Sequence, residues 1–356
     1  MRILITAPSL NENENVSGIS TLIRGIISGS KATFVHFPAG RKDGGKFDFS
    51  WVLTQIKQPF AFNSALKREK PDVIHINTSF EPRAIIRDSI FAARARSSAR
   101  PVLLHVHGGR FVLQDFTSSI LAGRAEQLLK NASKIIVQSR AERESLLKRI
   151  PGLDIAVLPN AVQIDKIPQA AREPGEKTII FFGRLHESKG LNDIVESCRM
   201  LLEQGFKFKF ACCGAGPHRE PFISKMKEIL GERFHDGGVI LGPEKWRVLN
   251  QGDFFLLPSR YEGLPIALLE AMAAGCVPVV SNVGMIGDVV KDGRNGFIIE
   301  PGNLTMIAGK LKMVLSESEI TLQELRENAR KTIREKFDFA EYITKLDRIY
   351  SEMTRQ

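Results

Sequence analysis

Short β-rich runs alternate with helical patterns along almost the whole chain, and this alternation restricts the folds available to it. In the first half, the helical patterns lie between β-rich runs, at about 19–29, 82–96, 116–130 and 140–149. In the second half, they alternate with runs that read TIIFFG, FKFACCG, GVILG, DFFLLPS, VPVVS and GFIIE, and lie at about 190–204, 218–230, 244–250, 265–274 and 304–316. Strands that alternate with helices form parallel sheets with right-handed crossovers. The sequence therefore predicts an α/β protein with doubly wound sheets.

The length of the chain indicates two domains. With 356 residues, it exceeds the size at which a single hydrophobic core usually stops growing. The segment QAAREPGEK, residues 169–177, has the proline, glycine and charge typical of a linker. We expect one domain over 1–168, a second over 178–336, and a final helix over 337–356. The periodicity of this last helix leaves open which domain it joins.

Composition excludes several classes of protein. With 43% hydrophobic and 25% charged residues, the chain is neither disordered nor fibrous. The apolar run at the N-terminus is short and predicts a first strand rather than a signal peptide, and no apolar stretch reaches the roughly 18 residues of a membrane span. Cys198, Cys212, Cys213 and Cys276 lack CxxC spacing and predict reduced, buried thiols. We expect a cytoplasmic protein.

The positive charge is concentrated in the first half. Residues 1–165 carry 23 Lys and Arg against 14 Asp and Glu, whereas residues 166–356 carry 27 against 26. The segment 81–100 alone holds five arginines, and its apolar residues fall near another helical face. One interpretation is attachment to an anionic membrane at the inner face of the cell; the other is a solvated basic surface. Nucleic acid is not expected, because aromatic residues do not interleave with the basic ones.

Four loops that follow predicted strands carry residues suited to binding an anion. Ligands of doubly wound sheets bind at the carboxyl ends of the strands, where helices begin and offer unpaired N–H groups. The chain has neither GxxxxGK[ST] nor GxGxxG after the first strand, and it has no Asp-x-Asp pair to hold a metal-bound diphosphate. Besides the N–H groups at helix starts, cationic side chains are the groups that can hold a phosphate here. The loop residues concerned are Gly18, Gly183, Arg184, Lys189, Gly214 and Pro265.

Two glutamates bracket the start of the apolar helix in RYEGLPIALLEAMAAG. Glu262 precedes this helix and Glu270 lies within it. Carboxylates beside a phosphate-binding helix start would accept hydrogen bonds from the hydroxyls of a sugar or a ribose. The alternative is structural: Glu262 would interact with the helix dipole, and Glu270 would pair with a surface arginine.

Several segments in the same order resemble the retaining glycosyltransferases of family four. These are RYEGLPIALLEAMAAGCVPVV, FFGRLHESKG, CCGAGP, IIVQSRAERESL, LPNAVQID and DVVKDGRNGFIIEPGN, and together they extend the resemblance over nearly the whole chain. The resemblance implies a glycosyltransferase-B fold, in which two Rossmann-like domains face a central cleft. It also implies that the first domain binds the acceptor, that the second binds a nucleotide sugar, and that the final helix crosses back to the first domain.

The resemblance also implies roles for individual residues. Glu270 would bind the ribose hydroxyls, and Glu262 the transferred sugar, aided by the backbone of Gly263, Leu264, Pro265 and Ile266. Arg184 and Lys189 would stabilise the departing diphosphate without a metal or another cofactor. Gly18, Gly183 and Gly214 would let backbone approach the donor, and His107 would contact the donor sugar. For His107 the alternative is a hydrogen-bonded core residue, and we assign that role to the other six histidines.

The function that follows is a metal-independent, retaining transfer of a hexose-type sugar from a nucleotide diphosphate sugar to an acceptor hydroxyl. A lipid-linked or cell-surface glycan precursor is the expected acceptor. A nucleotide-sugar epimerase and a non-catalytic nucleotide-sugar binder are the alternatives on the same fold. Two departures from the family pattern, GMIGD at 284–288 and a single glycine in NENVSGIS, affect the inferred sugar pocket.

Overall fold

The computed structural model describes residues 1–12, 14–40, 49–116, 118–168 and 175–355. Contacts between residues divide the chain into two units, which we call unit 1 (Met1–Asn160 and Ala340–Gln356) and unit 2 (Ala161–Phe339). Unit 2 thus begins before the linker expected at 169–177, of which residues 169–174 lie outside the described residues. Each unit has its own parallel six-stranded sheet, which confirms the predicted α/β class.

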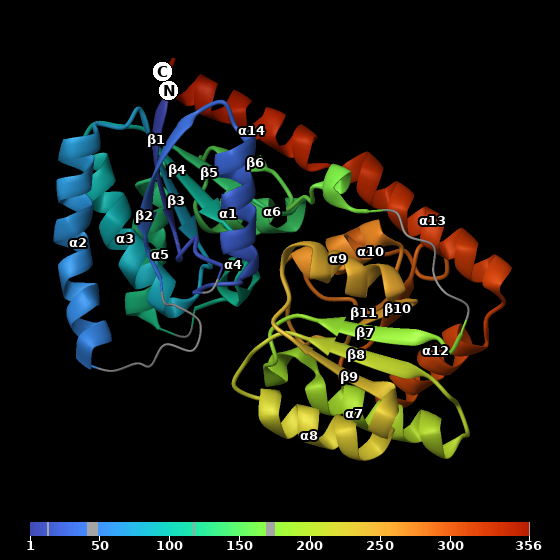
Figure 1. Cartoon of the computed structure of the whole chain (residues 1–356). Coiled ribbons are helices and arrows are strands. Elements are labelled where there is room, and N and C mark those ends of the chain that lie inside the picture. The colour runs from blue at the N-terminus through green and yellow to red at the C-terminus, as the bar shows by residue number, and fades with distance from the viewer. Residues whose placement is uncertain (13, 41–48, 117, 169–174, 356) are drawn as a thin grey trace. The chain divides into compact units, whose positions relative to one another are not determined.

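The sheet of unit 1 has the strand order β2-β1-β3-β4-β5-β6 (Figure 1). Its central strands are buried on both faces; all six residues of β3, VIHINT, are buried. Burial of successive residues on both faces is typical of a parallel sheet covered by helices on both sides. The strands are β1 (Arg2–Ala7), β2 (Thr33–Pro38), β3 (Val73–Thr78), β4 (Val102–Val106), β5 (Lys134–Val137) and β6 (Ile155–Val157).

The helices of unit 1 agree with the sequence prediction except in three places. The predicted helix at 116–130 begins only at Ser119, because the Ser118 side chain accepts a bond from Leu121 N and caps it. The sequence did not predict the four-residue α4, nor α2, whose pattern is interrupted by Pro59. The helices are α1 (Gly18–Gly29), α2 (Phe49–Glu69), α3 (Pro82–Arg96), α4 (Arg110–Leu113), α5 (Ser119–Lys130), α6 (Arg140–Arg149) and α14 (Phe339–Met353).

The last helix, α14, packs on unit 1 from Ala340 onward (Figure 1). Its Tyr350 hydroxyl lies 2.7 Å from Nδ1 of His75 in the middle of the sheet. One turn earlier, Asp347 accepts a hydrogen bond from Ser30, at the end of α1. The helix therefore completes the core of unit 1, although it follows the whole of unit 2 in the sequence.

The sheet of unit 2 has the order β12-β11-β10-β7-β8-β9. The predicted strand GVILG is wrong: β9 ends at Gly238, and the apolar residues after it leave the sheet. Gly238 and Gly242 have φ of +60° and +55°, which breaks the extended conformation on both sides of Val239–Leu241. The strands are β7 (Thr178–Phe182), β8 (Lys209–Cys213), β9 (Phe234–Gly238), β10 (Phe254–Leu257), β11 (Val277–Ser281) and β12 (Phe297–Ile299).

Five helices of unit 2 lie within a few residues of their predicted positions, namely α7, α8, α9, α10 and α12, whereas the sequence did not predict the four-residue α11. The four cysteines, all in this unit, are free and buried as predicted. Nowhere in the described part of the chain does a helix have the length and apolar character that a membrane crossing requires. The helices are α7 (Leu191–Glu203), α8 (Arg219–Leu230), α9 (Gly242–Gln251), α10 (Ile266–Ala274), α11 (Ile286–Val289), α12 (Leu304–Ser316) and α13 (Glu319–Lys336).

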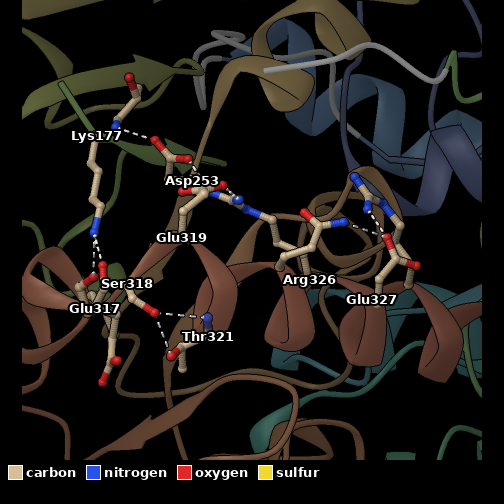
Figure 2. Close-up of polar contacts among 12 residues, drawn as sticks. Lys177, Asp253, Glu317, Ser318, Glu319, Thr321, Arg326 and Glu327 are labelled. Carbon is tan, nitrogen blue, oxygen red and sulfur yellow. Dashed lines mark hydrogen bonds and ion pairs between the residues drawn. The ribbon is translucent and has the colours of Figure 1, made fainter. Parts of the chain in front are cut away.

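A buried arginine ties α13 to the sheet of unit 2 (Figure 2). The Arg326 side chain is 3% exposed, and its Nη2 lies 2.6 Å from Oδ1 of Asp253, the residue before β10. Its Nη1 pairs with Glu319 at the start of α13. The other oxygen of Asp253 accepts a 2.8 Å bond from the N–H of Thr178, where β7 begins. One charged cluster thus joins the beginnings of two strands and a helix.

Candidate functional site

The predicted donor-binding loops of unit 2 gather at the carboxyl ends of its strands and bond to one another. Leu185 N, after β7, donates to Ala215 O, after β8, at 2.9 Å. Arg260 N, after β10, donates to Ser188 O at 2.8 Å, which joins the third loop to the first. Three loops that are distant in sequence therefore form one continuous surface.

At two contacts between these loops, the backbones approach so closely that only glycine fits. Gly190 has φ +72°, and a Cβ there would lie 2.3 Å from Pro258 O. Gly214 has φ +147°, and a Cβ there would lie 1.8 Å from Gly183 O. Gly214 therefore has a structural reason of its own, the contact with the neighbouring strand end, besides the donor-binding role predicted for it, whereas a Cβ on Gly183 would meet only Phe181, at 3.9 Å.

The structure brings Lys189 and Glu262 together. The Lys189 ammonium lies 2.5 Å from Oε1 of Glu262, and the two side chains are 21% and 8% exposed. Ser259 Oγ donates to the same oxygen at 2.7 Å. The sequence predicted that Lys189 binds a diphosphate and that Glu262 binds a sugar. Because the two side chains are in contact, the two predicted binding positions lie side by side.

Arg184 lies beside this pair in sequence but differs from it in environment. Its side chain is exposed, and it makes no ion pair with another residue in the described part of the chain. A cation without a protein counterion, at the edge of a surface with a second cation, is suited to an anionic ligand.

Glu270 is buried in α10 and paired with a lysine that the sequence did not single out. Lys245, on α9, places its Nζ 2.6 Å from Glu270 Oε1. Burial raises the pKa of the Glu270 carboxyl, and the neighbouring ammonium of Lys245 opposes this rise. The alternative in which Glu270 pairs with a surface arginine is therefore wrong.

The turn between the two glutamates is held by the segment that departs from the family pattern. Met285 N donates to Gly263 O at 3.0 Å, and a Cβ on Gly284 would lie 2.3 Å from Glu262 O. Leu264 is buried, Pro265 caps α10 and Ile266 is its first residue. An open pocket adjoins this turn and is lined by Asn282, Gly284, Gly287, Asp288, Val290, Lys291, Asp292 and Ile298.

In unit 1, His107 follows β4 directly and is oriented by Asn77. The Nδ2 group of Asn77 donates to Thr6 O at 2.8 Å, so its Oδ1 faces His107 Nε2 at 2.6 Å. A carbonyl oxygen only accepts, so Nε2 carries the proton and Nδ1 is left as an acceptor. The other predicted residue of this unit, Gly18, is exposed as the first residue of α1, behind the cap that Ser17 provides.

His107 ends a row of three imidazoles in the sheet of unit 1. The His105 and His107 ring centroids are 4.0 Å apart, and His75 stacks on His105 at 5.5 Å. Burial lowers the pKa of His75 and of His107 to about 3, and that of His105 also falls well below its ordinary value of 6.5. Three histidines are therefore held neutral inside the fold.

We expect unit 1 to lose stability as the pH falls from about 6.5 towards 3. In this window the unfolded chain binds protons that the folded unit excludes. The free energy of unfolding therefore has its full value above pH 6.5 and declines as the pH falls below 6.5. One pKa unit of lowering corresponds to about 1.4 kcal/mol. Denaturant titrations across this window should show a weaker pH dependence in His105→Gln than in the matched surface variant His235→Gln. An equal dependence in both variants would contradict this account.

Two family models match the sequence of this chain. Residues 163–332 match the model described as glycosyl transferases group 1, and residues 24–161 match the glycosyl transferase 4-like domain. The two matches cover most of both units. The chain belongs to the group 1 glycosyl transferases. The family four resemblance predicted from the sequence is thereby confirmed.

Individual relatives of this glycosyltransferase chain differ in what they make. It is 26% identical to glycogen synthase of Mycobacterium tuberculosis, over 63% of this chain and 55% of that protein. It is 24% identical to the UDP-Gal:alpha-D-GlcNAc-diphosphoundecaprenol alpha-1,3-galactosyltransferase of Escherichia coli, over 85% of this chain and 81% of that enzyme. In the first of these relatives the match spans about half of the relative's length.

Solved structures show the glycosyltransferase-B fold. Sucrose-phosphate synthase from Thermosynechococcus elongatus has a TM-score of 0.78 at 17% identity, covering 99% of this chain and 98% of that one. HepE from Anabaena, solved in complex with UDP-glucose, has a TM-score of 0.76 at 17% identity and covers 99% and 100%. The predicted fold is therefore confirmed over the full length of the glycosyltransferase.

The sequence did not identify three polar residues that lie at these sites. Lys245, Ser259 and Asn77 contact Glu270, Glu262 and His107, respectively. None belongs to a motif that distinguishes it from other polar residues. Among the described residues, no three His, Cys, Asp or Glu side chains form a group that could hold a metal ion.

Proposed function

We propose that this glycosyltransferase moves a hexose-type sugar from a nucleotide diphosphate sugar to an acceptor hydroxyl, with retention of the anomeric configuration and without a metal. The observation that carries the proposal is the contact between Lys189 and Glu262 at the loop before α10. It sets a cation suited to a diphosphate beside a carboxylate suited to sugar hydroxyls. The galactosyltransferase relative, named for UDP-Gal, and the HepE complex with UDP-glucose support a nucleotide-sugar donor.

The proposed roles follow the chemistry of each side chain. Arg184 and Lys189 neutralise the diphosphate as it departs, Glu262 holds the transferred sugar and Glu270 holds the ribose. The backbone of Gly263, Leu264 and Ile266 adds N–H groups for the sugar, with Pro265 shaping the turn, and Gly18, Gly183 and Gly214 provide close backbone approach. His107, whose Nδ1 is an acceptor, is assigned to a hydroxyl of the donor sugar.

The proposed reaction needs little covalent chemistry from the protein. The bond between the anomeric carbon and the diphosphate oxygen breaks, and the acceptor oxygen bonds to the same face of that carbon. The departing phosphate oxygen takes the proton of the acceptor hydroxyl. The contribution of the protein is then positioning and electrostatic stabilisation of the leaving group.

A nucleotide panel tests the proposal directly. UDP, GDP, ADP and TDP, each with chelator present, would be screened by thermal shift, followed by sugar nucleotides of the base that binds. A rise in melting temperature with one nucleotide, and a product of retained configuration by NMR, is the expected result. Absence of any shift, or a shift that requires a divalent cation, would overturn the donor site proposed here. Epimerised nucleotide sugar without an acceptor would identify an epimerase instead.

For the acceptor we propose a lipid-linked glycan precursor reached from an anionic membrane surface. The helix α2 exposes Leu53, Ile56 and Phe60 on one side, with Ile56 60% and Phe60 65% exposed. On the neighbouring helix α3, the Arg94 guanidinium lies 5.3 Å from the centre of the Phe60 ring. Exposed apolar side chains among basic ones are typical of surfaces that enter the headgroup region. The name of the galactosyltransferase relative, which includes a diphosphoundecaprenol acceptor, agrees with this choice.

Vesicle flotation tests this surface. We expect the protein to float with vesicles rich in phosphatidylglycerol at low salt, and less with neutral vesicles or at high salt, because the attraction is partly electrostatic. Ile56→Ser with Phe60→Ser should reduce binding several-fold, since each removes apolar area. The control is Ile320→Ser, a similarly exposed isoleucine in unit 2. Absence of flotation with anionic vesicles at low salt would reject the membrane proposal.

A further inference from the structure

The buried contact between Lys245 and Glu270 is unusual for a pair of charges. The ammonium lies 2.6 Å from Oε1, and the side chains are 14% and 8% exposed. The same ammonium lies 4.5 Å from the centre of the Trp246 ring, so an aromatic face adds to its environment. Both charges are thus largely removed from water.

Stability alone does not account for this pair. Burial of two charges costs desolvation energy, and well-packed apolar side chains of similar volume are often as stabilising or more so. Other charged side chains on the helices around α10 pair elsewhere, as in Glu244–Arg247, Arg326–Asp253 and Arg330–Glu327. Lys245 therefore acts on Glu270 specifically.

The effect of Lys245 on Glu270 is to favour the charged form of the carboxylate and to fix one of its oxygens by a hydrogen bond. Burial favours the neutral form of Glu270, and the ammonium opposes this. Within the described residues, Lys245 is the hydrogen-bond donor to this side chain, and the bond goes to Oε1. The remaining oxygen, Oε2, accepts no hydrogen bond from another described side chain, and it is the oxygen that a hydroxyl donor could use.

We propose that Lys245 is a positioning residue for recognition of the ribose, and that Glu270 and Lys245 act as one unit that distinguishes a ribonucleotide from a 2′-deoxyribonucleotide. The inference rests on the proposed function, in which Glu270 accepts from the ribose hydroxyls. A carboxylate that is ionised and fixed forms a stronger bond to a hydroxyl than a neutral, mobile carboxyl does. Loss of Lys245 should therefore reduce discrimination between the two sugars more than it reduces binding of the diphosphate.

The experiment compares dissociation constants for UDP and 2′-deoxy-UDP, GDP and 2′-deoxy-GDP, and ADP and 2′-deoxy-ADP, using the base that the wild type binds. We expect the wild type to prefer the ribonucleotide by about tenfold or more, as one charge-assisted hydrogen bond would give. Lys245→Met should bring this ratio close to one, and the conservative variant Lys245→Arg should retain most of it. A purely structural lysine would lower the melting temperature of Lys245→Met and leave the ratio unchanged, which would overturn the inference.

A second comparison covers the case in which Lys245→Met alone does not fold. The double variant Lys245→Met with Glu270→Gln removes both charges and should fold, because no unpaired buried charge remains. Its ratio should equal that of Glu270→Gln alone; a different ratio would show that Lys245 acts independently and would overturn the inference. A wild type that binds these nucleotides with no ribose preference overturns the inference but keeps the proposed function. A wild type that binds only TDP, a 2′-deoxyribonucleotide, likewise overturns the inference alone. A wild type that binds none of the four nucleotides overturns both.

Discussion

Replacing Lys189 with alanine should lower turnover of the nucleotide sugar by about 100-fold or more. The ammonium is proposed to meet the negative charge that develops on the departing diphosphate, and loss of one such preorganised donor typically has an effect of this size. In this protein the change also leaves Glu262, whose side chain is 8% exposed, without its cationic partner. We therefore expect kcat to fall, through loss of the cation and through loss of the contact that holds the Glu262 side chain in place. Steady-state kinetics with the nucleotide sugar would measure the change.

The control for this variant is Lys134→Ala. Lys134 is similarly buried and pairs with Asp154 at 2.9 Å, but it lies at the start of β5 in unit 1. It should keep nearly all activity. Arg184→Ala should resemble Lys189→Ala in turnover without its effect on Glu262, since Arg184 is exposed. Near-normal turnover in both Lys189→Ala and Arg184→Ala would overturn their assignment to the diphosphate.

Replacing Arg326 with methionine should destabilise unit 2 by about 3–5 kcal/mol. Removal of one partner from a buried ion pair leaves the other charge uncompensated, which costs this much in typical cases. Here the charge left behind is that of Asp253, which also holds the N–H of Thr178 where β7 begins (Figure 2). Denaturant unfolding, followed by a signal that reports unit 2, would measure the change.

The matched control is Lys331→Met on the same helix. The Lys331 side chain is 68% exposed and lies 3.9 Å from Glu335. An exposed pair of this kind contributes little, so the free energy of unfolding should change by less than about 0.5 kcal/mol. The double variant Arg326→Met with Asp253→Asn should recover part of the lost stability, because it also removes the negative charge of Asp253 that Arg326 balances in the wild type. Equal stability of Arg326→Met and Lys331→Met would contradict the role assigned to this cluster.

Local pattern in the sequence was sufficient for the order and type of most elements. The alternation of strands and helices predicted two parallel sheets, and several segments in the same order carried the resemblance to the family. Pattern failed where local signals conflict with the fold. The apolar residues after Gly238 resemble a strand but follow a glycine with positive φ, and α2 contains a proline and several exposed apolar residues.

The sequence by itself determined which residues carry charge and hydroxyl-binding chemistry, and which strand ends they follow. Only the tertiary structure decided which of them meet. Lys189 pairs with Glu262 across 73 positions of sequence, and Tyr350 reaches His75 across 275. Periodicity reports which face of an element is buried, but a side-chain pair depends on how separate elements are placed against each other. That placement is set by close packing of the whole sheet and its helices, so Lys245 and Asn77 acquired their significance only when the chain was folded.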